Sequence, residues 1–395
     1  MMNSTRRQFL KRTGLTTLVL VSGGLVWRAV DNGVFNIGEG PAYEPWRNWQ
    51  SDADKGPLTL VRAGILAANA HNTQPWLFRI AEGQIKLYAD TSRNLGSFDP
   101  YLREMHISLG CALTNMEIAA SASGYGASID IVPGKLHLSE DTPADPLIAT
   151  ITLTPATIAP SALYGAIPHR HTNRGAYDLG HSVPASAKDA FRDPQQPGIE
   201  VYLADNAEAL TELGTLIVSS TEQIIKDHEM SGDSSKWFRM SRDDVDQYRD
   251  GVTIDAFGLP PMMNVGAKII PAPSAGLSDS QWLSGTRDTH VGTAPLLGAI
   301  CVADLYDKAT AIKAGMQWQR MHLWATDQGM AMHPLNQPAE LVDRDQQLGR
   351  PSAMADQLAN LMAPTKGKPT FFFRAGYAER PARLSPRRPL KSVIL

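Results

Sequence analysis

A chain of 395 residues is long enough to bury a full hydrophobic core and to carry two domain-sized units. Its 37 basic and 40 acidic side chains nearly balance and form no long run of one charge, which excludes the electrostatic pattern typical of nucleic-acid-binding proteins. The sequence has no HExxH, GxSxG or GxxxxGK[ST] motif, and its two cysteines lie in apolar stretches, so zinc-hydrolase, serine-hydrolase and P-loop chemistry are excluded as well.

The first 31 residues have the pattern of an export signal. Arg6 and Arg7 precede an apolar run, Leu15 to Trp27, which is too short and too rich in Ser, Thr and Gly for a membrane span. The segment TRRQFLK resembles the twin-arginine signal, with Thr5 in place of the usual serine. This resemblance implies export, to the periplasm or elsewhere, by a route that carries folded proteins, often with a cofactor. A basic amphipathic anchor is the alternative, and cleavage of the signal stays open.

The predicted elements after the signal alternate between helix and strand. A linker rich in Pro, Gly and Trp covers 32–57. Apolar residues at helical spacing predict helices over 60–69, 106–123, 209–226 and 315–329. Short β-branched, aromatic and aliphatic runs predict strands over 84–90, 127–132, 149–154, 199–204, 296–303 and 369–377. The chain is therefore expected to be a mixed α and β protein of the α+β class.

Two of the predicted helices resemble each other at an offset of 205 residues, which aligns Gly110 with Gly315 and Gly124 with Gly329. Glycines at equal separations favour a shared geometry, such as a close crossing of the two helices at the first pair and a helix end at the second. A chance match between two helices rich in Ala and Gly is the alternative. The match suggests two copies of one fold.

Two polar segments are candidates for a ligand site. The stretch AANAHNTQPW places small residues beside several amides, which suits either a polar surface loop or a loop against a flat polar ligand. In PHRHTNRGAYD, Arg170, Thr172 and Arg174 alternate, so an extended backbone would direct two guanidiniums and a hydroxyl toward one ligand. That set suits a phosphate, and an exposed basic loop is the alternative. No metal is expected, because the nearby histidines have no carboxylate or cysteine beside them.

Three segments together resemble motifs of the nitroreductase superfamily of FMN proteins. One is ANAHNTQPW, similar to A-P-S-x-x-N-x-Q-P-W with Asn69 in place of the serine. The others are RHTNRGAY, similar to the R-x-S-x-[KR]-x-[FY] phosphate motif, and RAGYAERPARLSPRRPL, similar to the G-Y-P…R-x-P-L ending. The segment DPYLREMHISLGCALTN further resembles the Acg-type branch. The resemblance covers about residues 58–395.

This resemblance implies a nitroreductase-like fold in two tandem pseudo-repeats that form an intrachain pseudo-dimer. The first half would cover 58–160 and the second 161–395, with an insertion at about 230–290. In nitroreductases FMN lies between two chains, with the arginine motif from one and the N-x-Q-P-W loop from the other. Here the first half has only the loop and the second only the arginines, so one composite FMN site is expected.

The resemblance also assigns FMN contacts residue by residue. Arg170 and Thr172 would hold the phosphate, and Arg174 would reach the pyrimidine edge of the isoalloxazine, where negative charge develops on reduction. Gly329 and Met330 would present a backbone N–H to flavin N5. The other contacts would come from Asn69, Ala70, His71, Asn72 and Gln74 and from Arg387 or Arg388, while Trp76 would be core. No catalytic side-chain acid or base is implied.

Residues 230–290 depart from the superfamily pattern by mixing Trp, Phe and Met with Pro and Gly. The segment is interpreted either as a lid over the flavin or as a helical subdomain without a gating role.

Two functions fit these expectations. The first is an exported FMN-dependent oxidoreductase that passes two electrons from a nicotinamide or other donor to a quinone, nitro compound or similar acceptor. Export weakens the nicotinamide option, since reduced nicotinamides are cytoplasmic. The second is a flavin-binding or flavin-storing protein whose closed lid denies a second substrate access. The expected partners are the twin-arginine machinery and a small-molecule donor and acceptor, with membrane contact only through the N-terminal segment.

Overall fold

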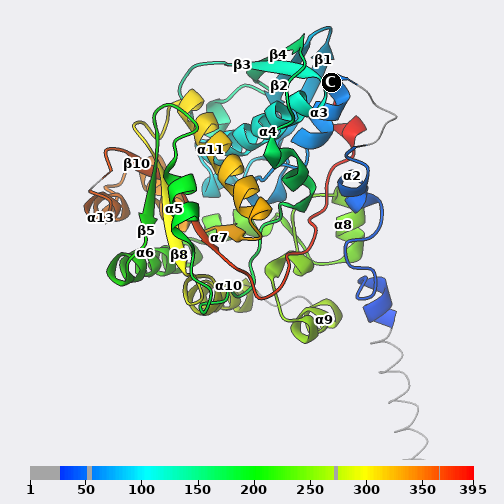
Figure 1. Ribbon diagram of the computed structural model, residues 1–395. Coiled ribbons are helices and arrows are strands. Elements are labelled where there is room, and N and C mark those ends of the chain that lie inside the picture. The colour runs from blue at the N-terminus through cyan, green and yellow to red at the C-terminus, as the bar shows by residue number, and fades with distance from the viewer. Residues whose placement is uncertain (1–26, 51–55, 271–274, 364) are drawn as a thin grey trace, which may run out of the picture.

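The computed structural model describes residues 27–50, 56–270, 275–363 and 365–395. Most of the signal predicted over 1–31 lies outside the described residues. Within the described part of the chain, no helix is both long and apolar enough to cross a membrane. Figure 1 shows two β-sheets on opposite sides of a pair of long helices, α4 (Arg103–Ala122) and α11 (Lys308–Asp327).

The two sheets share one topology. The first has the order β1-β2-β4-β3 and the second the order β5-β8-β10-β9, and all neighbouring strands within each are antiparallel. In each half a long helix follows the second strand, and the third strand follows that helix. The strands are β1 (Trp76–Ala81), β2 (Gln84–Ala89), β3 (Tyr125–Ile131), β4 (Leu147–Pro155), β5 (Ile199–Ala204), β8 (Leu296–Val302), β9 (Ala331–Pro334) and β10 (Lys368–Gly376).

Further helices surround this frame. The helices are α2 (Glu44–Arg47), α3 (Pro57–Gly64), α5 (Ala185–Arg192), α6 (Ala207–Lys226), α12 (Gln337–Gln347) and α13 (Ala353–Leu361). The insertion contains α7 (His228–Ser235), α8 (Arg242–Tyr248), α9 (Pro261–Ile269) and α10 (Ala275–Ser284), with the short parallel pair β6 (Phe238–Arg239) and β7 (Val252–Thr253). The α+β class predicted from the sequence is therefore confirmed.

The two long helices meet at the glycines that the repeat aligned. A Cβ atom on Gly110 would lie 2.0 Å from the carbonyl oxygen of Ile312, and one on Gly315 would lie 1.9 Å from that of Ile107. Only glycine permits such an approach of two backbones. Both ends of α11 lie 205 residues after those of α4, so helices and contacts follow the sequence repeat. The predicted close crossing is confirmed.

The second pair of aligned glycines ends the same two helices. Gly124 and Gly329 follow the capping residues of α4 and α11 with φ angles of 79° and 71°, in the left-handed region that glycine adopts without strain. The predicted helix ends are confirmed, and each glycine turns the chain toward the next strand of its sheet.

Several elements differ from the sequence predictions. The sequence patterns did not predict four elements, β1, β9, α12 and α13. The strand β1 begins at Trp76, directly after a proline that is typical of a loop, and the other three elements are short. The predicted linker over 32–57 contains α2 and buries Trp46 and Trp49 in the main core. Aromatic burial against the body of the protein therefore makes this segment more than a spacer.

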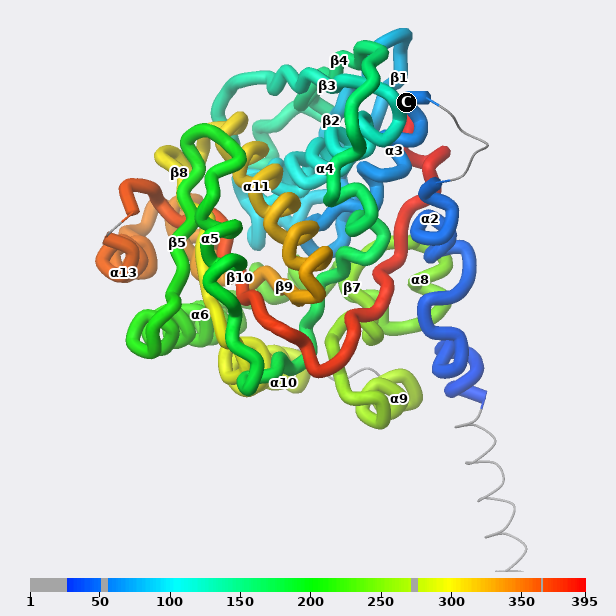
Figure 2. The backbone as a smooth tube through the Cα atoms, viewed as in Figure 1, coloured from blue at the N-terminus to red at the C-terminus, as the bar shows by residue number. Residues whose placement is uncertain are grey.

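The C-terminal arm joins the two halves a second time. After β10 the chain crosses the molecule to the first half, as the red tube in Figure 2 shows. There Phe78 of β1 donates its backbone N–H to Val393 at 2.7 Å and accepts from Leu395 at 2.8 Å, so the arm adds to the edge of the first sheet. Residues 385–388 are thereby placed beside the loop that precedes β1.

Replacing Gly315 with alanine is expected to lower the free energy of unfolding by about 3 kcal/mol, because the methyl group would meet a backbone oxygen that cannot move without separating the helices. Chemical denaturation measures this loss. Gly232→Ala in α7 is the matched control, since a Cβ at that position would have nothing within 4 Å; it should change stability by less than about 1 kcal/mol. Wild-type stability of Gly315→Ala would contradict the close crossing.

Candidate functional site

Two buried arginines from distant parts of the chain meet at the start of the polar loop. Arg170 and Arg387 are each only 2% exposed. Both donate to the carbonyl of Leu66, at 3.1 and 3.4 Å, and Arg387 also lies over the Trp46 ring with its carbon 4.7 Å from the centroid. Burial lowers the pKa of Arg170 to about 10, and burial followed by the charge of Arg170 lowers the pKa of Arg387. Two like charges thus share one dry site.

Two of the other buried arginines, Arg103 and Arg344, have acidic partners, whereas Arg374 donates to backbone carbonyls. Arg103, 1% exposed, donates to Asp343 of α12 at 2.7 Å, and Arg344 pairs with Asp227 and Glu229. In the described part of the chain no carboxylate forms such a pair with Arg170 or Arg387, and the Nε atom of each has no hydrogen-bond partner there. A buried guanidinium without a counter-charge is costly, so this pair is chemically suited to an anion.

Two histidines near these arginines also have buried ring nitrogens without hydrogen-bond partners among the described residues. These nitrogens are Nδ1 of His171 and Nε2 of His322. Nδ1 of His322 lies 3.5 Å from Arg170. Burial, then the charges of Arg170 and Arg387, lowers the pKa of His171 to about 3, and burial and Arg170 lower that of His322. Both rings are therefore neutral at pH 7, and the positive charge here belongs to the guanidiniums.

Arg174 lies at the other end of the basic segment, where it meets the loop and the insertion. Its guanidinium donates to the carbonyl of Ala256 at 3.3 Å, and burial lowers its pKa to about 10. Burial and then the nearby charge of Arg174 lower the pKa of His71 to about 4, so arginine and loop histidine face one region. The His71 ring packs edge-on against Phe98 at 5.0 Å and stacks with Phe238 at 6.4 Å. This end has a cation among aromatic rings.

Arg374 of β10 holds the backbone on either side of Arg174. Its guanidinium donates to the carbonyls of Asn173 at 3.2 Å and Gly175 at 2.7 Å, on either side of Arg174, and lies 3.9 Å from the centroid of the Tyr177 ring. These bonds fix the backbone that carries Arg174. The sequence reasoning missed this role; the only sequence signal was an arginine within an apolar predicted strand.

The polar loop is strained and held by its own amides. His71, Asn72 and Gln74 have φ angles of 46°, 55° and 53°. Each left-handed non-glycine residue costs about 1–2 kcal/mol, and such strain is typical of functional loops. Asn69 Oδ1 accepts the N–H of Gln74 at 2.8 Å, and Ala70 N–H donates to Ser108 Oγ of α4 at 3.0 Å. The amide-rich composition is thus needed to hold this backbone.

The side chains of Asn72 and Gln74 bind protein on both sides of the loop. Asn72 Nδ2 donates to the carbonyls of Gly251 at 3.1 Å and Pro386 at 2.9 Å, and its Oδ1 accepts from Arg387. Gln74 Nε2 donates to Arg249 O at 2.9 Å. These bonds join the insertion and the C-terminal arm to the loop, and a contact of the two amides with a ligand stays a prediction.

The same contacts resolve which C-terminal arginine belongs to the site. Arg387 lies with Arg170, whereas the Arg388 guanidinium donates to Gln74 O at 3.0 Å and Asp90 at 3.3 Å. Arg388 therefore has a carboxylate partner and stabilises the loop from outside. Thr172 lies half-buried between Arg170 and Arg174 along the chain.

The expected contribution of Gly329 and Met330 differs from what the structure has. The N–H of Gly329 donates to Thr326 O at 3.0 Å and that of Met330 to Ala325 O at 2.7 Å, both within the end of α11. Met330 is 4% exposed and belongs to the main hydrophobic core. The glycine turn that ends the helix uses both backbone N–H groups, and their contact with flavin N5 stays a prediction.

The insertion covers the loop and Arg174. Besides the bonds to Arg249, Gly251 and Ala256, a Cβ on Gly258 would lie 2.3 Å from the backbone nitrogen of Gly175. Asp250 anchors this part by pairing with Arg93 of the first half and Arg239 of the insertion. The insertion therefore closes the end of the site where Arg174 and the aromatic rings lie.

The residues present fit a phosphate-bearing aromatic cofactor. The unpaired guanidinium and imidazole nitrogens suit the phosphate, and the aromatic rings near Arg174 suit an electron-accepting ring. The described residues contain no group of three or more His, Cys, Asp or Glu side chains arranged to hold a metal ion.

Sequence comparisons find relatives that cover most of this chain. No protein-family model matches it. "Putative NAD(P)H nitroreductase Rv3131" from Mycobacterium tuberculosis is 26% identical over 373 residues, which are 90% of this chain and 95% of that protein. "Putative NAD(P)H nitroreductase acg" from the same organism is 29% identical over 99 residues, 25% of this chain and 28% of that protein. The near-complete first match supports the nitroreductase-like fold.

Solved structures with some similarity are also nitroreductases by their descriptions. The FMN-dependent nitroreductase NfnB from Mycobacterium smegmatis, in complex with NADPH, is 17% identical and covers 57% of this chain and 94% of its own, with a TM-score of 0.36. A structure described as a "putative nitroreductase" from Anabaena variabilis is 12% identical and covers 75% of this chain and 69% of its own, with a TM-score of 0.39. At this distance they assign no ligand. By sequence, the chain is similar along nearly its whole length to a protein named as an NAD(P)H nitroreductase.

Proposed function

We propose that this protein is an FMN-dependent oxidoreductase of the nitroreductase type. The observation that carries the proposal is the meeting of Arg170 and Arg387, two buried guanidiniums without carboxylate partners in the described chain, beside a strained loop. The similarity to a protein named as an NAD(P)H nitroreductase supports the same function. Bound FMN would supply two-electron transfer, and the protein would supply binding, orientation and electrostatics.

The two ends of the basic segment have different roles in this proposal. Arg170 and Arg387 hold the phosphate, with neutral His171 and His322 as further hydrogen-bonding groups. Arg174 lies toward the flavin ring, where a fixed positive charge favours the reduced, more negative state. The aromatic residues around His71 exclude water from that end.

We further infer that the chain is a fused pseudo-dimer with one composite FMN site. The shared strand order and the reciprocal contacts of Gly110 and Gly315 support a duplicated fold. A symmetric dimer repeats every interface residue, but joined halves are free to diverge. Here the loop belongs to one half and Arg170 to Arg174 to the other, so a second pocket would lack both.

Flavin binding without turnover is the second candidate function. The bonds from the insertion to the loop and to Arg174 favour it, because a lid held at both places denies access to a second substrate. Steady-state reduction of quinones and nitro compounds by the flavin-loaded protein distinguishes the two. Turnover with any donor and acceptor pair supports the oxidoreductase, and its absence with a fully loaded, reducible flavin supports storage.

Export through the twin-arginine machinery is part of the same proposal. Arg6, Arg7 and the following weakly apolar run support it, and the expected location is the periplasm or another exported compartment, with or without the signal attached.

The purified protein is expected to contain one FMN per chain, and Arg387→Ala is expected to lower this ratio well below one. Losing one buried, charge-assisted phosphate contact costs about 1.5–3 kcal/mol, or roughly tenfold to a hundredfold in affinity. Acid-released flavin measured against protein gives the ratio. Arg388→Ala is the matched control, since its guanidinium pairs with Asp90 instead; it should keep a ratio near one.

Circular dichroism checks that both variants fold. A ratio near two in the wild type would contradict the single composite site, and full occupancy in folded Arg387→Ala would contradict the phosphate assignment.

Gly258→Ala is expected to speed the release of FMN by about tenfold, because a Cβ there would push the insertion away from Gly175 and loosen the cover over Arg174. Stopped-flow fluorescence after dilution measures the rate. Gly266→Ala in α9, with nothing within 4 Å, is the control. Unchanged release from Gly258→Ala would show that this contact does not retain the flavin.

Changing Arg6 and Arg7 together to lysine should leave folded, flavin-loaded protein in the cytoplasm, because the twin-arginine pattern needs both guanidiniums. Cell fractionation measures the distribution. Arg12→Lys, outside the pair, should be exported as the wild type is. Normal export of the double variant would rule out this route.

A further inference from the structure

Helix α9 of the insertion has its polar side turned inward. Asn264 and Lys268, one helical turn apart, are 8% and 6% exposed. Met262, Met263 and Ile270 are 89%, 60% and 65% exposed. An ordinary surface helix has the opposite arrangement, with its apolar stripe toward the core. Lys268 is the only charged residue of α9, so the outer side of this helix carries no charge.

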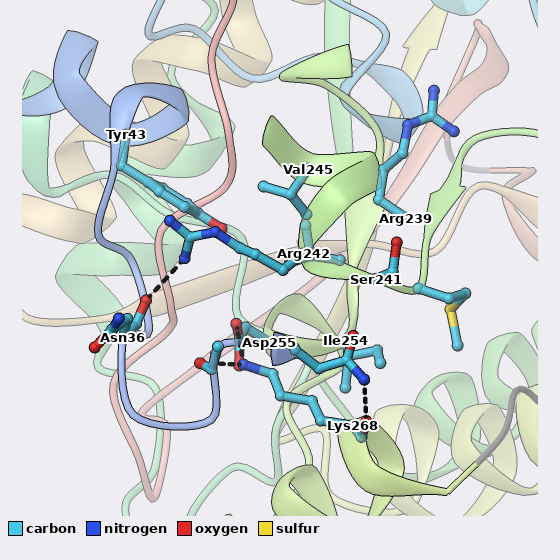
Figure 3. Close-up of a pocket in the computed structure, with 13 residues that line it drawn as sticks. Asn36, Tyr43, Arg239, Ser241, Arg242, Val245, Ile254, Asp255 and Lys268 are labelled. Atoms are coloured by element: carbon cyan, nitrogen blue, oxygen red, sulfur yellow. Dashed lines mark hydrogen bonds and ion pairs between the residues drawn. The ribbon is translucent and has the colours of Figure 1, made fainter. Parts of the chain in front are cut away.

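The buried polar residues are fully used inside the protein. Lys268 Nζ pairs with Asp255 at 2.8 Å and donates to Gly33 O at 3.3 Å, as Figure 3 shows in the pocket behind α9. Asn264 Nδ2 donates to Ile254 O at 3.3 Å. These bonds fix the rotation of the helix about its axis, so Met262 and Met263 cannot turn inward without breaking a buried ion pair.

The N-terminal segment adds exposed apolar side chains beside α9. Asn32 Nδ2 donates to Lys268 O at 2.7 Å, so the two segments lie side by side, at the lower right of Figure 1. Trp27, Val30 and Phe35 are 65%, 61% and 75% exposed. We call the set Trp27, Val30, Phe35, Met262, Met263 and Ile270 the apolar face.

Leu277 of α10 and Tyr248 of α8, 51% and 48% exposed, belong to the same insertion, and other exposed apolar residues lie far from it in the sequence. Ile158, Leu179 and Leu348 are 47%, 61% and 46% exposed and belong to separate parts of the chain. Single residues of this kind are normal on protein surfaces, whereas a contiguous group marks an interaction site. The apolar face gathers six exposed apolar side chains on two segments that a hydrogen bond holds side by side.

The sequence that leads into the apolar face indicates what covers it. The apolar run Leu15 to Trp27 ends at Trp27, the first residue of the apolar face, and Arg6, Arg7, Lys11 and Arg12 all precede that run. Apolar residues next to a basic cluster favour the surface of a bilayer with anionic lipids. The charge-free outer side of α9 suits the same surface, because no charge has to leave water.

We propose that the apolar face lies against the surface of a phospholipid bilayer, with α9 as an interfacial helix beside the N-terminal segment. Membrane contact then involves the insertion, beyond the N-terminal contact expected from the sequence. The insertion that covers Arg174 is thereby held at the membrane. This inference does not depend on FMN binding.

A probe at position 262 tests the proposal in the full-length protein. The natural thiols, Cys111 and Cys301, are buried, so Met262→Cys is labelled selectively with bimane. Vesicles of phosphatidylethanolamine and phosphatidylglycerol with brominated acyl chains should quench this probe by about twofold or more relative to unbrominated vesicles, because its side chain enters the acyl boundary. Leu348→Cys with the same label should be unaffected.

Each other outcome would overturn the proposal. Protein that sediments with vesicles while the label at 262 stays unquenched would show that α9 stands clear of the bilayer, and failure to sediment would show that no bilayer is bound. A blue-shifted label without vesicles would mean that protein covers the face: a second copy if the shift grows with protein concentration, the chain's own N-terminal residues if it does not.

A second variant checks that the side chains themselves provide binding. Replacing Met262, Met263 and Ile270 together with glutamine should lower the vesicle partition coefficient by about tenfold, since each loses apolar area to bury. The matched triple variant changes Ile158, Leu179 and Leu348 to glutamine and should partition as the wild type does. Equal partitioning of both triple variants would contradict the proposal.

Discussion

The backbone contact between α4 and α11 at Gly110 and Gly315 determines where the parts of the site lie. Because the helices touch without intervening side chains, groups on both helices lie close to the polar loop and to Arg170. Gln319 of α11 accepts the N–H of Ala68, at the start of the polar loop, at 3.1 Å, and Ser108 of α4 accepts the N–H of Ala70 at 3.0 Å. His322 of α11 lies against Arg170. Loop and arginine are thus held by one pair of crossed helices, and larger residues at the crossing would move them apart.

The candidate site lowers the free energy of unfolding of the fold that contains it. A buried charge whose partner is removed destabilises a fold by about 3–5 kcal/mol. Arg170 and Arg387 are buried charges of this kind, since no described carboxylate pairs with them. The adjoining loop has three left-handed non-glycine residues. Elsewhere the same protein pairs the buried Arg103 and Arg344 with carboxylates. Local conflict of this kind, confined to one place in an otherwise well-paired structure, is typical of a binding site that a ligand completes.

The sequence predicted the parts of the fold that depend on local pattern. Apolar periodicity found α4, α6 and α11, and the repeated glycines predicted both the crossing and the helix ends. The sequence also predicted that Arg170 would meet the polar loop. It missed what depends on tertiary contacts: the use of Asn72 and Gln74 as links to the insertion, the helix-end bonds of Met330, and Arg374 behind Arg174. An amide has the same donors and acceptors for protein as for ligand, so composition alone does not choose between them.

Comparison of FMN with riboflavin tests the central claim most directly, since the two differ only in the phosphate. Isothermal titration of the flavin-free protein measures both affinities. If Arg170 and Arg387 hold the phosphate, FMN should bind at least about a hundredfold more tightly, from two charge-assisted contacts of about 1.5–3 kcal/mol each. Equal affinity for FMN and riboflavin would show that the buried arginines do not form a phosphate site and would contradict the account.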